Sequence, residues 1–312
     1  MERNVSLDSL KFLMAIMVVG IHTSLFTNIS GRLDFVAVNG LFRIAVPVFF
    51  IVSGYYFANV STVEKLKTWV KRILLLYAFW MVVYLPFYLP ESGFQYPKKE
   101  AEPLLMTLLF GYVHLWYVAA MIPGGLILYR IRNWSSSRIL LIAIGLYCTG
   151  VLIQYIKYFY FYDISLFYYR NFLFFGLPMM ILGFCASKIG VTRFADRTLV
   201  LALAVGILLL MTEVLFAYRH AIWRGGFDMY LGLIVITPAI FILIMKSKFS
   251  YSIKGLSLAP SVVYFSHVFF IIVMDYYLGW PHGMKMFLVT LSCTFIFALI
   301  TSRFPSAARI VF

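Results

Sequence analysis

The first long apolar segment reads LDSLKFLMAIMVVGIH over residues 7–22. Past Lys11 it has the composition of a membrane-spanning helix, yet it ends on His22, an ionisable residue that a lipid-facing helix does not carry. Lys11 and His22 are eleven residues apart. This spacing is about three turns, so both side chains leave one face, roughly 16 Å apart along the axis. Asp8 shares that face. The stripe predicts either a functional site near mid-membrane, or a histidine bonded to a neighbouring helix with Lys11 reaching lipid headgroups.

The composition is that of a polytopic helical membrane protein. Of the 312 residues, 63% are hydrophobic and 12% are charged, which is about half the charged fraction of a soluble domain. Apolar runs of about 20 residues recur along the chain. We therefore predict an all-α fold in which residues 1–312 form one membrane-embedded domain without a separate soluble domain. The ten expected transmembrane helices cover residues 9–27, 39–59, 72–90, 104–129, 138–156, 171–187, 198–217, 229–246, 257–277 and 284–303.

The net charge of +14 is distributed as membrane topology requires. If the N-terminus is cytoplasmic, seventeen of the 26 Lys and Arg residues fall on the cytoplasmic side. This asymmetry follows the positive-inside rule and predicts that both termini are cytoplasmic. Nucleic acid is therefore not an expected partner. The densest basic cluster contains Lys65, Lys67, Lys71 and Arg72, and it fits a topology signal and a phosphate-binding site equally well.

Other polar residues within the predicted spans are further site candidates. The stretch HLWY at 114–117 suits an interfacial aromatic belt or a sugar-stacking surface. Arg170 and Asn171 stand at the start of the sixth helix, where a guanidinium suits an anionic or sugar ligand. Glu213 is an acid well inside a predicted span, so it is expected to be functional or paired. Its candidate partners follow within about a dozen residues: Arg219, His220 and Arg224.

Tyr264 and His267 are i,i+3 neighbours on one face of the ninth predicted helix. His267 is expected about as deep in the membrane as His22. Two buried histidines at one level indicate a shared polar cavity, although a purely structural hydrogen bond between helices would place them equally. The three cysteines have no CxxC or metal-ligand spacing, so no metal site is predicted.

Six stretches, taken in order, resemble the acyltransferase-3 family of integral membrane acyltransferases. They are residues 7–22, VPVFFIVSGY at 46–55, KRI at 71–73, HLWY at 114–117, RNFLFFGLP at 170–178 and YFSH at 264–267. Each motif alone is weak, and their order over nearly the whole chain carries the resemblance. Family members commonly have arginine where this chain has Lys11, which keeps the charge but loses the bidentate fork. Many relatives also carry a fused periplasmic esterase-like domain, so this chain is expected to act alone.

The resemblance implies transfer of an acetyl group from acetyl-CoA to a hydroxyl of an envelope carbohydrate, such as O-antigen, capsule or another surface polysaccharide. It assigns His22 as general base, with Lys11 and Asp8 beside it, and acetyl-CoA as co-substrate without a bound cofactor. A covalent acetyl-histidine intermediate stays open. The expected donor-binding residues are Lys67, Lys71 and Arg72. The expected acceptor-binding or supporting residues are Ser53, Tyr55, His114, Trp116, Tyr117, Arg170, Asn171, Glu213, Tyr264 and His267.

Two other functions also fit buried histidines and a lone glutamate. One is a proton-coupled secondary transporter, and the other is a non-catalytic membrane partner or sensor. Within the enzyme hypothesis, the alternative acceptor is an amine or an amino acid, as in the membrane domains joined to serine racemases. The expected location is the bacterial cytoplasmic (inner) membrane. The expected partners are acetyl-CoA, a lipid-linked or surface carbohydrate and membrane lipids.

Overall fold

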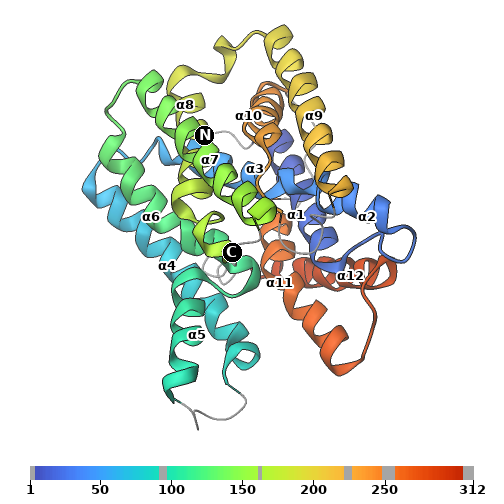
Figure 1. The fold of residues 1–312 in the computed structure, drawn as a ribbon. Helices are drawn as coiled ribbons and strands as arrows, with labels where there is room; N and C mark the ends of the chain where they lie inside the picture. Colours follow the sequence, from blue (N-terminus) through green and yellow to red (C-terminus); the bar gives the residue numbers. More distant parts are fainter. Residues whose placement is uncertain (1–3, 91–96, 161–163, 221–226, 248–256, 305–312) are drawn as a thin grey trace.

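The computed structural model describes residues 4–90, 97–160, 164–220, 227–247 and 257–304. Within these ranges the chain is helical and contains no strand (Figure 1). The helices are α1 (Val5–Thr23), α2 (Gly31–Val38), η1 (Leu41–Ile44), α3 (Ala45–Phe57), α4 (Val63–Tyr88), α5 (Pro97–Phe110), η2 (Val113–Leu115), α6 (Trp116–Ile131), α7 (Ser136–Tyr160), η3 (Leu166–Tyr168), η4 (Phe172–Gly176), α8 (Leu177–Ile189), η5 (Val191–Arg193), α9 (Asp196–Arg219), α10 (Leu231–Lys246), α11 (Ala259–Ile272), η7 (Val273–Tyr277) and α12 (Met284–Thr301).

Each of the ten predicted spans contains a helix, which confirms the all-α polytopic membrane fold. Among the described residues, eight helices are long and apolar enough to cross a membrane. A ninth crossing exists if the bent pair Lys99–Phe110 and Val113–Ile131 counts as one span. The remaining predicted span corresponds to α10, which is apolar but has only 16 residues. The cytoplasmic location of both termini stays a prediction.

The sequence predicts one transmembrane helix over 104–129, and the structure divides this stretch into α5, η2 and α6. The chain bends there by 53° between α5 and η2. Gly111 has φ +89°, and a Cβ on it would lie 2.6 Å from the backbone of Leu115 and Trp116. Only glycine adopts this conformation without strain. The break places His114 on the short helix η2, where its side chain is buried.

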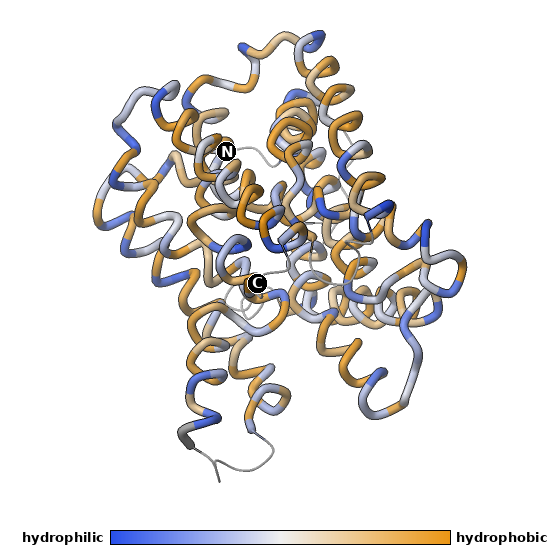
Figure 2. The backbone as a smooth tube through the Cα atoms, in the orientation of Figure 1, coloured by the Kyte–Doolittle hydropathy of each residue, from blue (hydrophilic) through white to orange (hydrophobic). Residues whose placement is uncertain are grey.

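The helices form an inner group and an outer group. In α3–η1–α2, η4–α8 and α11–η7, 61% of the most apolar window is buried, and in α1 half of it is. In α4, α7, α9 and α12 a third or less is buried. The outer helices instead expose side chains such as Val82, Leu141 and Leu208. Figure 2 shows hydrophobic residues along the helices and hydrophilic ones mainly at their ends and connections. This pattern is that of a lipid-facing surface.

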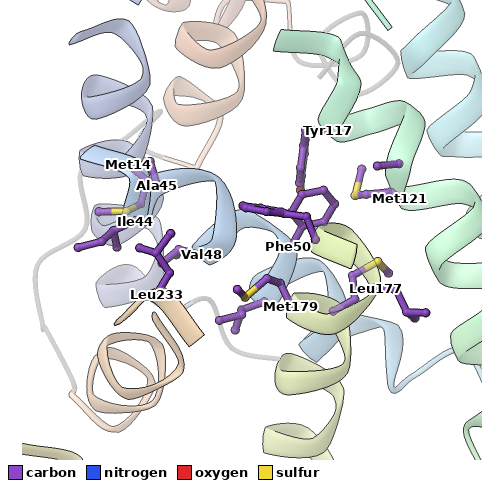
Figure 3. Close-up of a cluster of buried hydrophobic side chains, with 14 of the residues drawn as sticks. Met14, Ile44, Ala45, Val48, Phe50, Tyr117, Met121, Leu177, Met179 and Leu233 are labelled. Carbon is purple, nitrogen blue, oxygen red and sulfur yellow. The ribbon is translucent and has the colours of Figure 1, made fainter. Parts of the chain in front are cut away.

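The tightest helix contact joins α3 to α8. A Cβ on Gly54 would overlap the backbone of Met180, and one on Gly183 would overlap the Ile51 carbonyl. Small residues allow such close approach of helices in membranes. Figure 3 shows the adjoining core, in which Phe50 of α3 lies beside Tyr117 of α6. The crossing therefore fixes the positions of the helices that surround the site.

Helix α1 begins and ends four residues earlier than the predicted span 9–27. Its start is capped by Asn4, whose side chain accepts a hydrogen bond from the Leu7 amide at 3.0 Å. It ends at Thr23, where Ser24 adopts a left-handed conformation with φ 47°. His22 is therefore the penultimate residue of α1 and not part of its middle.

Candidate active site

Three histidines from separate helices meet inside the bundle. The ring centroids of His22 and His267 lie 5.0 Å apart, those of His114 and His267 4.8 Å apart, and those of His22 and His114 6.4 Å apart. His267 lies midway along Ala259–Tyr277. The rings of His22 and His267 therefore meet, although His22 stands at a helix end, and their common depth in the membrane stays a prediction.

The hydrogen bonds of His267 define its tautomer. Its Nδ1 lies 2.6 Å from the Tyr264 carbonyl oxygen and 3.2 Å from that of Val263, so Nδ1 donates. Nε2 then carries the lone pair of a neutral ring. This atom is buried without a hydrogen-bond partner among the described residues. The ring nitrogens of His114 are also buried and make no hydrogen bond of standard geometry within the same ranges.

A cavity of about 140 Å³, here called the His22 cavity, opens beside this histidine cluster. Its polar lining consists of His22, Trp116, Arg43, Arg170 and Asp228. Arg43 and Arg170 each form an ion pair with Asp228. The guanidinium carbon of Arg170 also lies 5.0 Å from the centre of the Trp116 ring. The predicted residues Trp116 and Arg170 thus lie at the same cavity as His22.

Sequence reasoning missed two residues of the His22 cavity, Arg43 and Asp228. Arg43 falls inside the predicted span 39–59, where a charged side chain is as unusual as Glu213 is in its own span. Asp228 stands one residue before the predicted span 229–246 and so looks like an ordinary helix-end charge. An arginine inside a span was therefore the available signal for Arg43, whereas only the fold reveals Asp228.

The backbone around Asp228 is held by Gln154, a fully buried residue of α7. Its side-chain oxygen accepts hydrogen bonds from the amides of Asp228 at 2.9 Å and Met229 at 3.0 Å. Its amide nitrogen donates to the Met229 carbonyl at 2.7 Å. Burial alone would raise the pKa of Asp228, but the charges of Arg43 and Arg170 outweigh it and hold the pKa below its ordinary value. Asp228 is therefore a fixed carboxylate.

A second cavity, here called the Lys11 cavity, has a volume of about 170 Å³. Its polar lining includes Lys11, Ser53, Tyr117 and Tyr264. The Lys11 ammonium lies 2.7 Å from a carboxylate oxygen of Asp8, and the Ser53 and Tyr117 hydroxyls are 2.8 Å apart. Lys11 and His22, which share one predicted face of α1, therefore line two different cavities.

Tyr264 contacts both the Lys11 cavity and the histidine cluster. Its ring lines the Lys11 cavity and lies 5.4 Å from the His114 ring and 6.1 Å from the His267 ring. Its hydroxyl donates to the His114 carbonyl at 2.9 Å, which holds the ring in place. The side chains of Phe49 and Tyr117 pack against the same ring. A layer of aromatic rings thus lies beside both the Lys11 cavity and the histidine cluster.

An open groove of about 800 Å³ follows the first half of α4. Lys65 and Arg72 line it, whereas Lys67 and Lys71 are exposed on the same helix and do not. Leu76 lines both this groove and the Lys11 cavity, so the two adjoin. Among the predicted site residues, Tyr55 belongs to none of the three spaces, because its ring packs against Phe241 with centroids 5.2 Å apart.

Comparison with known proteins agrees with this arrangement of motifs. A family model described as "Acyltransferase domain", that of the acyltransferase-3 family, matches residues 4–303. This chain belongs to the acyltransferase-3 family. It is also 30% identical to the "Serine/alanine racemase" of Enterococcus gallinarum over 78% of this chain and 37% of that protein. It is 24% identical to an "Amino-acid racemase" of Enterococcus faecalis over 97% of this chain and 47% of that protein.

The chain spans less than half the length of these curated relatives. No solved structure matches it. The family match covers the helices that carry the three histidines and both cavities.

Two predicted acceptor residues cap helices. The Asn171 side-chain oxygen accepts from the amides of Leu173 at 2.8 Å and Phe174 at 3.0 Å. Its amide nitrogen donates to the Phe167 carbonyl at 2.9 Å. Both polar atoms of the Asn171 side chain are therefore used in capping the start of η4, directly after Arg170.

Glu213 caps the first turn of α10. Its carboxylate accepts from the amides of Leu231 at 3.0 Å and Gly232 at 2.9 Å, and from the Tyr155 hydroxyl at 3.2 Å. These partners replace the predicted Arg219 and His220, and the third predicted partner, Arg224, lies outside the described residues. A carboxylate at a helix N-terminus satisfies orphan amides and interacts favourably with the helix dipole.

We expect Glu213→Leu to destabilise the protein by about 1–3 kcal/mol, because two amides and a hydroxyl lose their acceptor. Glu213→Gln keeps one acceptor oxygen, so it is expected to lose less stability. The measurement is the apparent unfolding temperature in detergent. The rate of acyl transfer per folded protein is expected to be unchanged in both variants. A variant of unchanged stability but reduced transfer would instead give Glu213 the predicted role at the acceptor.

Proposed function

We propose that this protein transfers an acetyl group from cytoplasmic acetyl-CoA to a hydroxyl of an envelope carbohydrate, with His22 as general base. Family membership supports acyl transfer. The single observation that carries the rest is that Lys11 and His22, on one face of α1, line two separate cavities. The first of these, the Lys11 cavity, adjoins the α4 groove through Leu76.

The donor would enter along α4. Lys65 and Arg72 line a groove large enough for a nucleotide, and exposed Lys67 and Lys71 add to its positive field. The pantetheine arm would continue past Leu76 into the Lys11 cavity. Lys11, held by Asp8, can there meet the donor's polar groups. The roughly 16 Å from Lys11 to His22 then suits the extended thiol arm.

The reaction begins with the acceptor hydroxyl beside His22. The imidazole takes the hydroxyl proton as the oxygen attacks the thioester carbonyl. The C–S bond breaks, the acetyl group stays on the acceptor oxygen, and the CoA thiolate receives the proton. His267, neutral with its Nε2 lone pair buried near His22, can stabilise the imidazolium that forms. Tyr264 must move to let the thioester pass from the Lys11 cavity.

A second candidate acceptor is an amino acid or another amine. The names of the relatives from the two Enterococcus species, a serine/alanine racemase and an amino-acid racemase, favour it. The chemistry at His22 would be unchanged, because an amine also attacks the thioester after losing a proton. A proton-coupled carrier or a non-catalytic sensor would use the buried histidines without consuming acetyl-CoA. For a donor made in the cytoplasm, the corresponding location is the bacterial inner membrane.

The test is CoA release by purified protein in detergent, supplied with acetyl-CoA and a panel of envelope glycans and amino acids. Arg72→Gln is expected to raise the KM for acetyl-CoA about tenfold or more, because a hydrogen bond to a charged group is lost. Lys71→Gln removes the same charge from the adjacent position outside the groove, so its effect should be smaller. Absence of CoA release with every acceptor would contradict the proposed enzyme activity and would favour a proton-coupled carrier or a non-catalytic sensor.

A further inference from the structure

The His22 cavity carries an excess of positive charge. Two guanidiniums, Arg43 and Arg170, share the single carboxylate of Asp228. The remaining described lining residues are His22, Trp116 and five apolar side chains: Val18, Ile21, Val46, Val113 and Phe175. None of these supplies a negative charge. A buried charge without a counter-charge is costly, so an excess cation at a cavity favours an anionic ligand.

The geometry leaves hydrogen-bond donors free to meet such a ligand. Each guanidinium has five N–H donors, and Asp228 occupies one terminal nitrogen of each. A second nitrogen of Arg43 donates to Asn39 at 2.7 Å, but its Nε is buried without a partner among the described residues. The Asp228 side chain is 4% exposed, against 15% for Arg43 and 26% for Arg170. The carboxylate is thus the most buried of the three charged groups that line the cavity.

We propose that Arg43 and Arg170 form a subsite for an anionic group of the acceptor, beside the hydroxyl or amine that His22 deprotonates. Asp228, fixed by Gln154, positions both guanidiniums and sets their net charge at one. This inference rests on the proposed function and names its substrate class. In a cavity of about 140 Å³, the anion must lie within a few bonds of the reacting group. A carboxylate or a phosphomonoester meets that condition, and both suit the arginine fork.

The arrangement predicts discrimination against neutral acceptors. A neutral analogue would leave the buried Nε of Arg43 unpaired and the excess positive charge uncompensated, and such sites reject analogues strongly. Acidic sugars and hydroxy acids or hydroxy amino acids all present a hydroxyl near an anion. The expected acceptor is therefore a hydroxyl compound that also carries an anionic group. Comparing carboxylate with phosphate ligands shows which of the two anions the subsite prefers.

The first arm of the test measures binding without acetyl-CoA. Calorimetry on the detergent-purified protein compares glycerol, glycerate and glycerol 3-phosphate, and then methyl glucoside with methyl glucuronide. We expect the anionic member of each set to bind at least about tenfold more tightly than its neutral counterpart. The stronger of glycerate and glycerol 3-phosphate identifies the anion. Equal binding of neutral and anionic probes, or no binding of any anion at millimolar concentration, overturns the proposal.

The second arm uses variants that keep the fold. Arg170→Gln leaves the Arg43–Asp228 pair and should abolish the preference for anions, while Arg170→Lys restores part of it. Lys157→Gln is the matched control, because Lys157 contacts the rings of Tyr158 and Tyr169 and does not line the cavity. A preference that persists in Arg170→Gln overturns the subsite. Anion binding without any CoA release would contradict acyl transfer but support the subsite. CoA release without a preference for anions would support acyl transfer but contradict the subsite.

Discussion

Replacing His22 by alanine is expected to lower acyl transfer by about 10²- to 10⁴-fold, the contribution of a positioned general base. The substitution removes the imidazole that lies at the cavity with Arg43, Arg170 and Asp228. The measurement is the rate of CoA release with the best acceptor of the panel, at saturating acetyl-CoA. Because the proposed donor groove on α4 is remote from His22, acetyl-CoA binding should persist in the variant.

The control for this prediction is His220→Ala. His220 is an exposed histidine at the end of α9, where its Nδ1 lies 2.9 Å from the Phe216 carbonyl oxygen, and it lines none of the three spaces. This variant should release CoA at the wild-type rate. A His22→Ala protein that remains folded and keeps more than about a tenth of the wild-type rate would show that the base lies elsewhere. His114 would then be the next residue to replace.

Replacing Gly54 by alanine is expected to cost about 3 kcal/mol of stability or more, because the new methyl group meets backbone and not a movable side chain. The Cβ would overlap the Met180 carbonyl where α3 crosses α8. The two helices must then separate, and the membrane interior supplies no hydrophobic gain in return. The measurement is the apparent unfolding temperature at a fixed heating rate, together with the fraction of monodisperse protein after purification.

Gly145 offers a matched comparison on α7. A Cβ there meets nothing within 4 Å, and alanine is the better helix former by about 1 kcal/mol. Gly145→Ala should therefore leave stability unchanged or slightly raise it. If Gly54→Ala unfolds at the same temperature as Gly145→Ala, the close crossing of α3 and α8 is not needed for the fold.

Much of the helical framework could be predicted, because in a membrane protein each apolar run of about 20 residues forms a helix. The boundaries were less accurate. The predicted first span misses the start of α1 by four residues, since the Asn4 cap lies in a polar stretch that hydropathy does not detect. The predicted fourth span misses the bend at Gly111, because one glycine inside an apolar run marks a break only when its φ is positive.

The candidate site was predicted in part. His22 and His267 were predicted at one level and do meet, because each is a rare ionisable residue inside a span. Glu213 met the same criterion, yet it caps α10. An acid inside an apolar run shows that a partner is needed, but not whether that partner is a ligand or a helix end. Only the fold distinguishes these cases.

By itself the sequence determined the class of protein, the number of apolar segments and the face of α1 that carries Lys11 and His22. These features follow from composition and helical periodicity, which are local properties of the chain. The tertiary structure alone decided that Arg43, Arg170 and Asp228 surround His22, and that Lys11 lines a different cavity. Periodicity states which face of a helix is polar. Which residues that face meets depends on how helices distant in sequence pack, and here the glycine crossing of α3 and α8 sets that packing.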